Sequence, residues 1–323
     1  MERPLACWTG KDRYDNEVIP SLTIILKTGG CRHNRCRMCS YRLERYAGIP
    51  EEKLASLLIS QLDWVLANHN IANIPLIKIY TSGSFFDPGE VPIEVVEATA
   101  KIFQGKLVIA ETRPEYVDSD MIEDFIAVID NGTWKTPLYV AIGLETTSDE
   151  IREKCIDKGF SWEDFLKAVR EARKAGAGIK TYLLHKPLFL TENEAWVDMK
   201  NSIRTIAGII DLISMNPCTV QKNTELEYYW KKGTYRPPYL WSILSLLLNA
   251  PVHVTCDPVG GGHARGAHNC GRCDYEIIQA IQDFSLSADI GLLKEVYEKE
   301  CSCKEEWEFI LNQEQPYCMP LTR

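Results

Sequence analysis

This sequence contains no long hydrophobic run and does not begin like a secretory signal. Its most apolar stretch, residues 239–252, is interrupted by two serines, an asparagine and a proline. That stretch is also shorter than the roughly 20 residues that span a bilayer as a helix. The first ten residues lack a basic segment followed by an apolar one. We therefore expect a cytoplasmic protein that does not enter a membrane, with a buried helix at residues 239–252.

Internal repeats, low-complexity tracts and an overall excess of positive charge are also lacking. The 323 residues carry 36 Lys and Arg against 45 Asp and Glu, which argues weakly against a nucleic-acid partner. The charge is uneven, because residues 1–50 hold nine basic and five acidic side chains, whereas residues 274–323 hold four and eleven. A polyanion could meet the N-terminal part, since binding follows the local field, although solvated faces explain the same pattern.

Cysteine, in contrast, is abundant and clustered. Three of the twelve cysteines are residues 31, 36 and 39, and five lie between residues 256 and 303. Short spacings in an intracellular chain are typical of metal ligands, whereas disulfide frameworks belong to small secreted domains. We predict metal ligands in both clusters and buried apolar thiols at Cys155 and Cys218. Cys7 and Cys318 receive no assignment.

Short β-branched runs alternate with amphipathic segments, as in a parallel sheet covered by helices. The predicted strands are residues 21–27, 76–81, 106–111, 138–143, 178–184 and 211–216, and the predicted helices are 51–68, 92–104, 118–130, 161–175 and 193–209. Six such units predict the α/β class, with a partial (β/α)6 TIM-like barrel whose active site lies at the C-terminal strand ends. We assign residues 1–250 to this barrel and residues 251–323 to a small, metal-stabilised extension rich in Cys and His.

Cys31, Cys36 and Cys39 are the predicted ligands of an iron–sulfur cluster. Residues 30–41, GCRHNRCRMCSY, give the spacing C-x4-C-x2-C. Three protein thiolates on a 4Fe–4S cluster leave one iron open, where a substrate or cofactor can coordinate. Two alternatives remain, namely a zinc knuckle completed by His33 and a ferredoxin-type 2Fe–2S cluster completed by a distant fourth cysteine.

This loop resembles that of the radical S-adenosylmethionine superfamily, although the usual spacing there is C-x3-C-x2-C. In that family the open iron binds the amino and carboxylate groups of S-adenosylmethionine, and an electron from the cluster cleaves the cofactor to methionine and a 5′-deoxyadenosyl radical. Residues 141–160, AIGLETTSDEIREKCIDKGF, resemble the Elongator-like branch. The resemblance assigns the following residues to the cofactor: Met38 near the adenine, Ser82, Gly83 and Ser84 at the methionine amino group, Glu111 and Arg113 at the ribose or carboxylate, and Gly143 and Glu145 nearby.

Three downstream segments resemble the radical subunits of archaeal archaeosine synthases. They are NPCTVQKNTELEYYWKKGTYRPPYLWS (216–242), VTCDPVGGGHARGAHNCGRCD (254–274) and CSCKEEW (301–307). The resemblance implies a lyase of archaeosine biosynthesis that acts on tRNA. A partner subunit attaches lysine to 7-cyano-7-deazaguanine at position 15, and the radical subunit, supplied by an electron donor, cleaves a C–N bond of the adduct. The alternatives are another Elongator-like radical enzyme of tRNA modification and a non-enzymatic, zinc-stabilised RNA-binding protein.

The C-terminal cysteines are candidates for a second metal site. We expect zinc held by four of these five residues: Cys256, Cys270, Cys273, Cys301 and Cys303. The paired spacings of residues 270 and 273 and of residues 301 and 303 suit a closed tetrahedral site. A second iron–sulfur cluster would use the same ligands. Cys256, with His263 or His268, offers an alternative fourth ligand.

An RNA substrate needs cations for its phosphates and aromatic rings for its bases. The candidate cations are Lys222, Lys231, Lys232, Arg236, Arg265 and Arg272. The candidate rings are Tyr228, Tyr229, Trp230, Tyr235, His263 and His268. A core role for the aromatic residues at 228–241 is the more ordinary explanation. His185, at the end of a predicted strand, either lines the active site or caps the barrel.

Overall fold

The structure, a computed structural model, describes residues 1–316, so Cys318 lies outside the described residues. The chain forms two compact units. Unit 1 comprises residues 1–34, 41–143 and 160–180, and unit 2 comprises residues 35–40, 144–159 and the described residues from 181 onward. Each unit is described by itself below.

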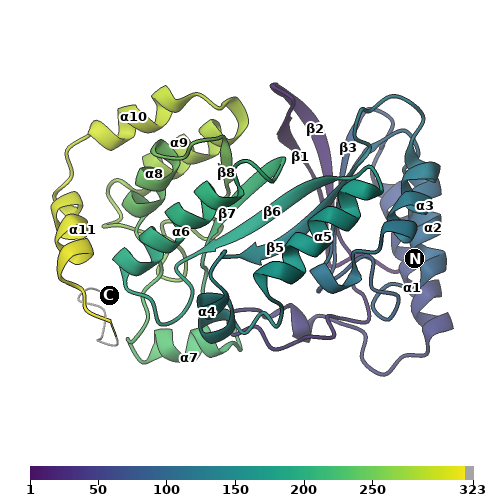
Figure 1. The fold of residues 1–323 in the computed structure, drawn as a ribbon, viewed down its shortest axis with the longest axis horizontal. Coiled ribbons are helices and arrows are strands. Elements are labelled where there is room, and N and C mark those ends of the chain that lie inside the picture. Colours follow the sequence, from purple (N-terminus) through teal and green to yellow (C-terminus); the bar gives the residue numbers. More distant parts are fainter. Residues whose placement is uncertain (317–323) are drawn as a thin grey trace. The chain divides into compact units, whose positions relative to one another are not determined.

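The described residues form eight strands, and sheet neighbours follow one another in chain order from β1 to β8. The strands are β1 (Ala6–Tyr14), β2 (Glu17–Ile25), β3 (Leu76–Tyr80), β4 (Leu107–Glu111), β5 (Leu138–Glu145), β6 (Gly178–His185), β7 (Leu212–Pro217) and β8 (Val254–Cys256) (Figure 1). The predicted α/β class and partial-barrel strand order are confirmed. The boundary between residues 250 and 251 stays a prediction.

All five predicted helices form, and their bounds differ from the prediction by at most a few residues at each end. The helices are α1 (Glu51–Asn68), α2 (Ile93–Ile102), α3 (Ser119–Ile129), α4 (Asp149–Ile151), α5 (Trp162–Lys174), α6 (Glu192–Ile206), α7 (Glu225–Lys231), α8 (Leu240–Leu248), α9 (Asp274–Ser287), α10 (Ile290–Glu298) and α11 (Ser302–Gln313). Short 3-10 turns are η1 (Tyr41–Leu43) and η2 (Pro114–Tyr116), and a π-helical turn, η3 (Arg152–Ile156), follows α4. Among the described residues no helix combines the length and apolar character needed to cross a membrane.

In unit 1, strands β2 to β5 pair in parallel, and β1 joins the edge of β2 in an antiparallel hairpin. Asp15 and Asn16 connect β1 and β2 with φ values of 51° and 72°, as a two-residue hairpin turn requires. The sequence analysis did not predict β1, because this edge strand carries Lys11, Asp12 and Arg13 on a largely exposed stretch.

The helices of unit 1 bury the apolar side chains that recur every three or four residues. In α1 these side chains are Leu54, Leu58, Leu62 and Val65, all nearly inaccessible to solvent. This spacing places them on one face of the helix, as expected for a helix that covers a sheet. The same periodicity explains why the position of α1 could be read from the sequence.

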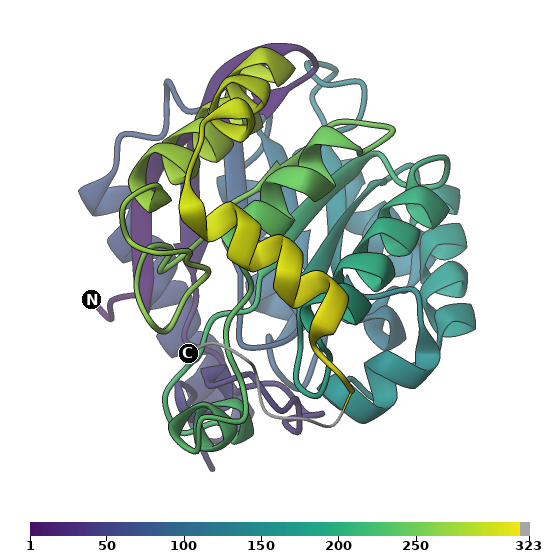
Figure 2. The same cartoon turned by 90° about the vertical axis from the view of Figure 1, so that its left-hand side faces the viewer.

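Unit 2 has a core built around β7, β8 and α8. Strands β7 and β8 pair in parallel, and eight of the nine residues of α8 are buried, which confirms a buried helix within residues 239–252. Helix α10 packs on α8 and α9, and α11 packs on α6; these last helices are the yellow-green to yellow ribbons of Figure 2. His185 is fully buried, and burial lowers its pKa to about 4, so this imidazole is neutral at physiological pH.

A buried ion pair between Lys186 and Glu192 is hydrogen-bonded to α8 within unit 2. The Glu192 carboxylate, 0% exposed, accepts hydrogen bonds from the Lys186 ammonium at 2.6 Å, the Ser242 hydroxyl at 2.5 Å and the Tyr239 backbone N–H at 3.0 Å. Burial favours the neutral form of Glu192, but Lys186 and the hydrogen bonds hold its pKa below the usual value. The Trp307 indole also donates to the Ser242 hydroxyl at 2.8 Å, which extends the network to α11.

Replacement of Lys186 by Met should therefore destabilise the protein by about 3–5 kcal/mol, because it leaves a buried carboxylate without its cation. Urea unfolding under anaerobic conditions measures the change. The double variant Lys186→Met with Glu192→Gln should recover much of the loss, while Lys294→Met at an exposed position of α10 should be neutral. A Lys186→Met variant as stable as Lys294→Met would contradict this role of the ion pair.

Candidate active site and metal centre

In unit 1, the residue Cys31 lies against the loop that follows β3. A Cβ atom built on Gly83 would stand 2.6 Å from the Cys31 Cβ and 2.8 Å from its Sγ, distances at which no side chain fits. Glycine at position 83 is thus required for this close approach of backbone and thiol. The predicted residues Cys31 and Gly83 are brought together.

The buried carboxylate of Glu90 holds this approach in place. Its Oε1 accepts hydrogen bonds from the Thr28 hydroxyl at 2.7 Å and the Gly83 N–H at 3.0 Å, and its Oε2 accepts one from the Ser84 N–H at 2.8 Å. The Thr28 oxygen also accepts from the Gly30 N–H at 3.3 Å. One side chain therefore connects the base of the cysteine loop with the turn after β3.

Glu90 is fully buried and was not among the predicted site residues. Burial raises its pKa, and the hydrogen bonds from Thr28 and Ser84 counteract that rise. A signal was present in the sequence, since an acidic residue follows Pro88-Gly89 in the short connection between β3 and α2. Such a connection at the C-terminal end of a strand is where site residues gather.

The other predicted residues of unit 1 lie around the same turn. The Ser82 hydroxyl is buried, and no hydrogen-bond partner for it is found among the described residues. The Ser84 hydroxyl accepts from the Arg113 N–H at 3.0 Å, and the Arg113 guanidinium pairs with Glu115 at 2.6 Å. Glu111 ends β4, and its carbonyl accepts from a backbone N–H of this turn at 2.8 Å. A buried hydroxyl with spare hydrogen-bonding capacity suits a ligand amino group.

In unit 2, residues 35–40 carry Cys36 and Cys39 and are fastened to α7. The Cys39 N–H donates to the Cys36 carbonyl at 3.2 Å, which closes a tight turn. The Arg37 guanidinium pairs with Glu225 at 2.6 Å, and the Arg37 carbonyl accepts from the Leu226 N–H at 3.2 Å. These bonds fix the backbone from which both thiols project.

Met38 packs on a hydrophobic cluster of unit 2. The buried members of that cluster are Leu188, Cys218, Val220, Leu226 and Tyr235. Cys218 is 0% and Cys155 is 7% exposed, so the predicted burial of both thiols is confirmed. The contact of Met38 with adenine stays a prediction.

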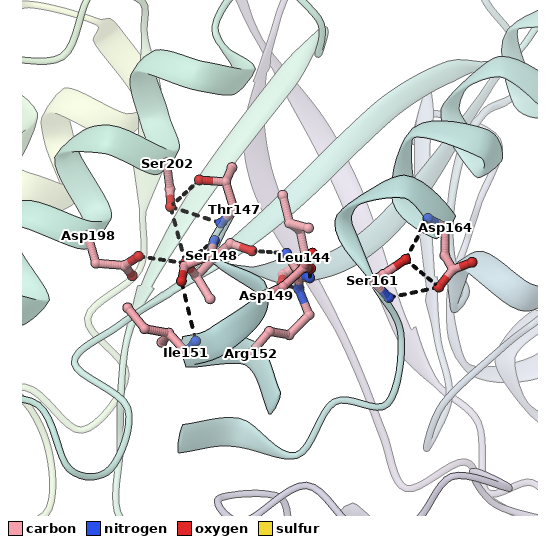
Figure 3. Close-up of polar contacts among 11 residues, drawn as sticks. Leu144, Thr147, Ser148, Asp149, Ile151, Arg152, Ser161, Asp164, Asp198 and Ser202 are labelled. Atoms are coloured by element: carbon pink, nitrogen blue, oxygen red, sulfur yellow. Dashed lines mark hydrogen bonds and ion pairs between the residues drawn. The ribbon is translucent and has the colours of Figure 1, made fainter. Parts of the chain in front are cut away.

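Glu145, at the end of β5, belongs to unit 2, and Gly143, two residues earlier, belongs to unit 1. Glu145 has a φ of 68° and pairs with the Lys158 ammonium at 2.6 Å. A left-handed φ is strained for a residue with a side chain, so the surrounding contacts must hold it there. Arg152 supplies two of them, because its buried guanidinium donates to the carbonyls of Leu144 and Thr146, on either side of Glu145 (Figure 3).

The turn after Glu145 is also fixed from α6. The Thr146 hydroxyl donates to Asp198 at 2.6 Å, and the Thr147 N–H donates to the Ser202 hydroxyl at 3.0 Å (Figure 3). Burial raises the pKa of Asp198 to about 6. The position of the Glu145 backbone thus depends on contacts with α6 and η3. The sequence analysis could not anticipate these contacts.

Four cysteines of unit 2 converge. The Sγ atoms of Cys270, Cys273, Cys301 and Cys303 all lie within 4.8 Å of one another. Individual separations are 4.0 Å (270 to 273), 3.7 Å (270 to 301), 3.5 Å (273 to 303) and 3.2 Å (301 to 303). The fifth candidate, Cys256, is buried in β8 and is not in this group.

The spacing of these sulfurs fits a single tetrahedral ion. With Zn–S bonds of about 2.3 Å, neighbouring sulfurs are about 3.8 Å apart. A cubane cluster instead binds each thiolate to a different iron, which separates the sulfurs more widely. The Trp241 indole N–H donates to the Cys303 sulfur at 3.2 Å, and the Asn269 amide donates to the Cys273 sulfur at 3.4 Å. Such donors stabilise metal-bound thiolates.

Cys270 is a thiol of this group whose pKa lies below the usual value. Burial opposes its ionisation, but hydrogen bonds from Arg272 and Cys303 outweigh that cost and lower its pKa to about 6. Cys273 and Cys301 immediately precede α9 and α11. Helix N-termini favour negative charge, so the site is suited to thiolates.

The candidate RNA contacts include exposed, half-buried and buried residues, and the half-buried ones are Tyr229, Trp230, Arg265 and His268. Tyr235 and Arg236 are buried, and the Arg236 guanidinium stacks on the Tyr239 ring at 3.5 Å. These two side chains belong to the core. For Tyr235 this agrees with the core role that the sequence analysis offered as the alternative to RNA binding. Tyr228 is 52% exposed. The other exposed candidates are Lys222, Lys231, Lys232, His263 and Arg272.

Comparison with known proteins gives consistent matches. A sequence model described as the Radical SAM superfamily matches residues 25–200. The archaeosine synthase subunit beta of Methanosarcina acetivorans is 38% identical over 95% of this chain and 90% of its own length. The protein of the same name from Thermococcus kodakarensis is 33% identical over 94% of this chain and 95% of its own length. The solved structure of a queuine lyase from Clostridium spiroforme, 18% identical, aligns with a TM-score of 0.45 over 67% of this chain and 80% of that one.

Replacement of Glu90 by Ala should lower the iron bound after anaerobic reconstitution by more than half, because Gly83 and Ser84 lose the acceptor that holds them near Cys31. The stability loss should be about 2–3 kcal/mol, the usual cost of removing a charged hydrogen-bond partner. Glu90→Gln should remain impaired, since its amide donor faces backbone donors. Glu94→Ala, exposed on α2, is the matched control, and equal iron contents in Glu90→Ala and Glu94→Ala would contradict the role of Glu90.

Proposed function

We propose that this chain, which belongs to the radical S-adenosylmethionine superfamily and within it to the family of archaeosine synthase beta subunits, is a radical lyase of tRNA modification. Its substrate is the lysine adduct of 7-cyano-7-deazaguanine at tRNA position 15, and cleavage of a C–N bond in that adduct gives archaeosine. The observation that carries this proposal is 38% identity to an archaeosine synthase subunit beta over 95% of the chain.

The proposed reaction suits radical chemistry. A C–H bond of a lysine side chain is too weakly acidic for Asp, Glu or His to deprotonate it, so a radical initiator is needed. Membership of the superfamily implies a 4Fe–4S cluster and S-adenosylmethionine, which together supply a radical that can abstract such a hydrogen atom. The target base must leave its stack in the folded tRNA to reach the site.

The chain's own residues have separate tasks in this proposal. Cys31, Cys36 and Cys39 hold the cluster, and the turn after β3 receives the amino group of the cofactor. The buried Ser82 hydroxyl, with no partner among residues 1–316, supports that assignment. The remaining cofactor contacts in the proposal are Met38, Gly83, Ser84, Glu111, Arg113, Gly143 and Glu145.

Zinc, in this proposal, occupies the site formed by Cys270, Cys273, Cys301 and Cys303, and Cys256 is not a ligand. The sulfur separations of 3.2–4.0 Å among these four residues support a single ion. Such a closed site has a structural role, because all four coordination positions belong to the protein. The proposed partners are the lysine-transferring archaeosine synthase subunit and an electron donor.

The reduced protein, incubated with S-adenosylmethionine and lysine-adduct tRNA, should yield archaeosine, detected by mass spectrometry of the digested nucleosides. Unmodified tRNA should yield none. Cys36→Ala should lower product formation by more than 100-fold, because the cluster loses a ligand, whereas Cys7→Ser in β1 should remain active.

Two results would count against this assignment. Cleavage of S-adenosylmethionine by Cys36→Ala at the wild-type rate would refute the proposed cluster ligands. Turnover of a different modified tRNA, with none of the lysine adduct, would favour another Elongator-like tRNA-modifying activity.

The two metal sites should respond to different substitutions. We expect about four irons and about one zinc per chain in anaerobically prepared protein. Cys270→Ser and Cys301→Ser should lose zinc and keep iron, and Cys36→Ala should lose iron and keep zinc. Cys256→Ser is the control and should keep both metals. Plasma emission spectrometry measures the contents; loss of iron alone from Cys270→Ser would point to a second cluster.

A further inference from the structure

Aromatic side chains form an exposed patch on α7 and the loop after β6, within unit 2. We call the rings of Phe189, Tyr228 and Tyr229 the stacking surface. Phe189 is 42% and Tyr228 is 52% exposed. Their rings lie 5.2 Å and 5.3 Å from the Tyr229 ring, nearly perpendicular to it in both cases. The exposed rings of Phe189 and Tyr228 thus each make an edge contact with the Tyr229 ring.

Cations accompany these rings. The Arg37 guanidinium lies over the Phe189 ring at 5.7 Å, and the Lys232 ammonium lies over the Tyr228 ring at 4.3 Å. Next to them, the Arg265 guanidinium lies over the Trp230 ring at 4.6 Å. Lys232 also donates a hydrogen bond to the Tyr228 hydroxyl. Cations interleaved with exposed rings are the combination that binds single-stranded nucleic acid, because phosphates pair with the charges and bases stack on the rings.

The stacking surface is joined to the cysteine loop. Arg37, which lies over Phe189, also pairs with Glu225 at the start of α7 and accepts a hydrogen bond from the Leu226 N–H. Arg37 directly follows Cys36 in the chain. A nucleotide held on this surface would therefore lie beside the backbone that presents two of the proposed cluster ligands.

We propose that the stacking surface binds unpaired nucleotides of the RNA substrate next to the base that is modified. This proposal rests on the proposed function, which makes RNA the substrate. Phe189 and Arg37 were absent from the RNA contacts expected from the sequence, because both lie outside the segment 222–272 that supplied those candidates. A protein partner is the competing occupant, and a bordering cation on each exposed ring favours RNA over an apolar protein surface.

The test compares tRNA affinity among variants of the full-length protein with both metals loaded. Tyr228→Ala and Phe189→Ala should each weaken tRNA binding about tenfold in anaerobic filter-binding assays, and the double variant should weaken it more. Tyr228→Phe should bind within about twofold of wild type, because it keeps the stacking ring. Tyr275→Ala, at a 76% exposed position of α9, is the matched control and should bind as wild type does.

Folding and electrostatics are checked in the same experiment. Zinc content and melting temperature should be unchanged in Tyr228→Ala, because the ring is exposed. The slope of log affinity against log salt concentration should also be unchanged, because the substitution removes no phosphate contact. A loss of affinity together with a loss of stacking crosslinks from photoreactive bases to Tyr228 or Phe189 supports the proposal.

Wild-type affinity in the double variant overturns the proposal. So does a double variant that keeps tRNA binding but loses the lysine-transferring subunit in a pull-down, since the surface would then bind protein. Failure of the proposed reaction is distinguishable from failure of the proposed RNA-binding surface. If the wild-type protein makes no archaeosine but binds tRNA through Tyr228, the proposed reaction is refuted and the stacking surface is retained. If the double variant binds tRNA with undiminished affinity and still forms archaeosine, the stacking surface is refuted and the proposed reaction is retained.

Discussion

The approach of Gly83 to Cys31 is held by a single buried carboxylate, and the same carboxylate fixes the neighbouring Ser84. Glu90 receives three hydrogen bonds from two chain segments, so neither segment can shift without leaving a buried donor or acceptor unpaired. A buried carboxylate is costly unless such donors compensate it. A site that must keep a thiol against a backbone turn gains rigidity from this arrangement, because the hydrogen bonds fix the backbone directly and do not rely on flexible side chains.

Much of the fold could be predicted because its strands and helices have clear hydrophobic periodicity. Helix α1 was predicted with its observed bounds, and the six predicted strands were each located within a few residues. Strand β1 was missed, since an edge strand needs only one apolar side and its pairing with β2 is set by the Asp15-Asn16 turn. Strand β8 has three residues, too few for an alternation to be recognised.

Residues of the candidate site could be predicted where the chemistry requires one residue type, as for cysteine ligands. They could not be predicted where tertiary packing determines which side chains meet or which are exposed. Spacing singled out Cys31, Cys36 and Cys39, but nothing in the spacing indicated Glu90. The sequence offered five C-terminal cysteines for four ligand positions. In the structure two segments about 30 residues apart converge, and the four cysteines that meet do not include Cys256. Among the candidate RNA contacts, Tyr235 and Arg236 have the right chemistry but lie in the core, because composition does not reveal exposure.

The two cysteine groups differ in a way that matches different tasks. In the proposed function, the three thiolates of residues 31, 36 and 39 hold a cluster whose coordination they do not complete, so a position is left where a small molecule can bind. Four thiols from two helix starts close a tetrahedron and leave no such position. The C-terminal thiols lie at the starts of α9 and α11, so the proposed ion would add stability by joining these two helices. Under the proposed function, reactivity and stability therefore belong to separate sites that are both built from cysteine.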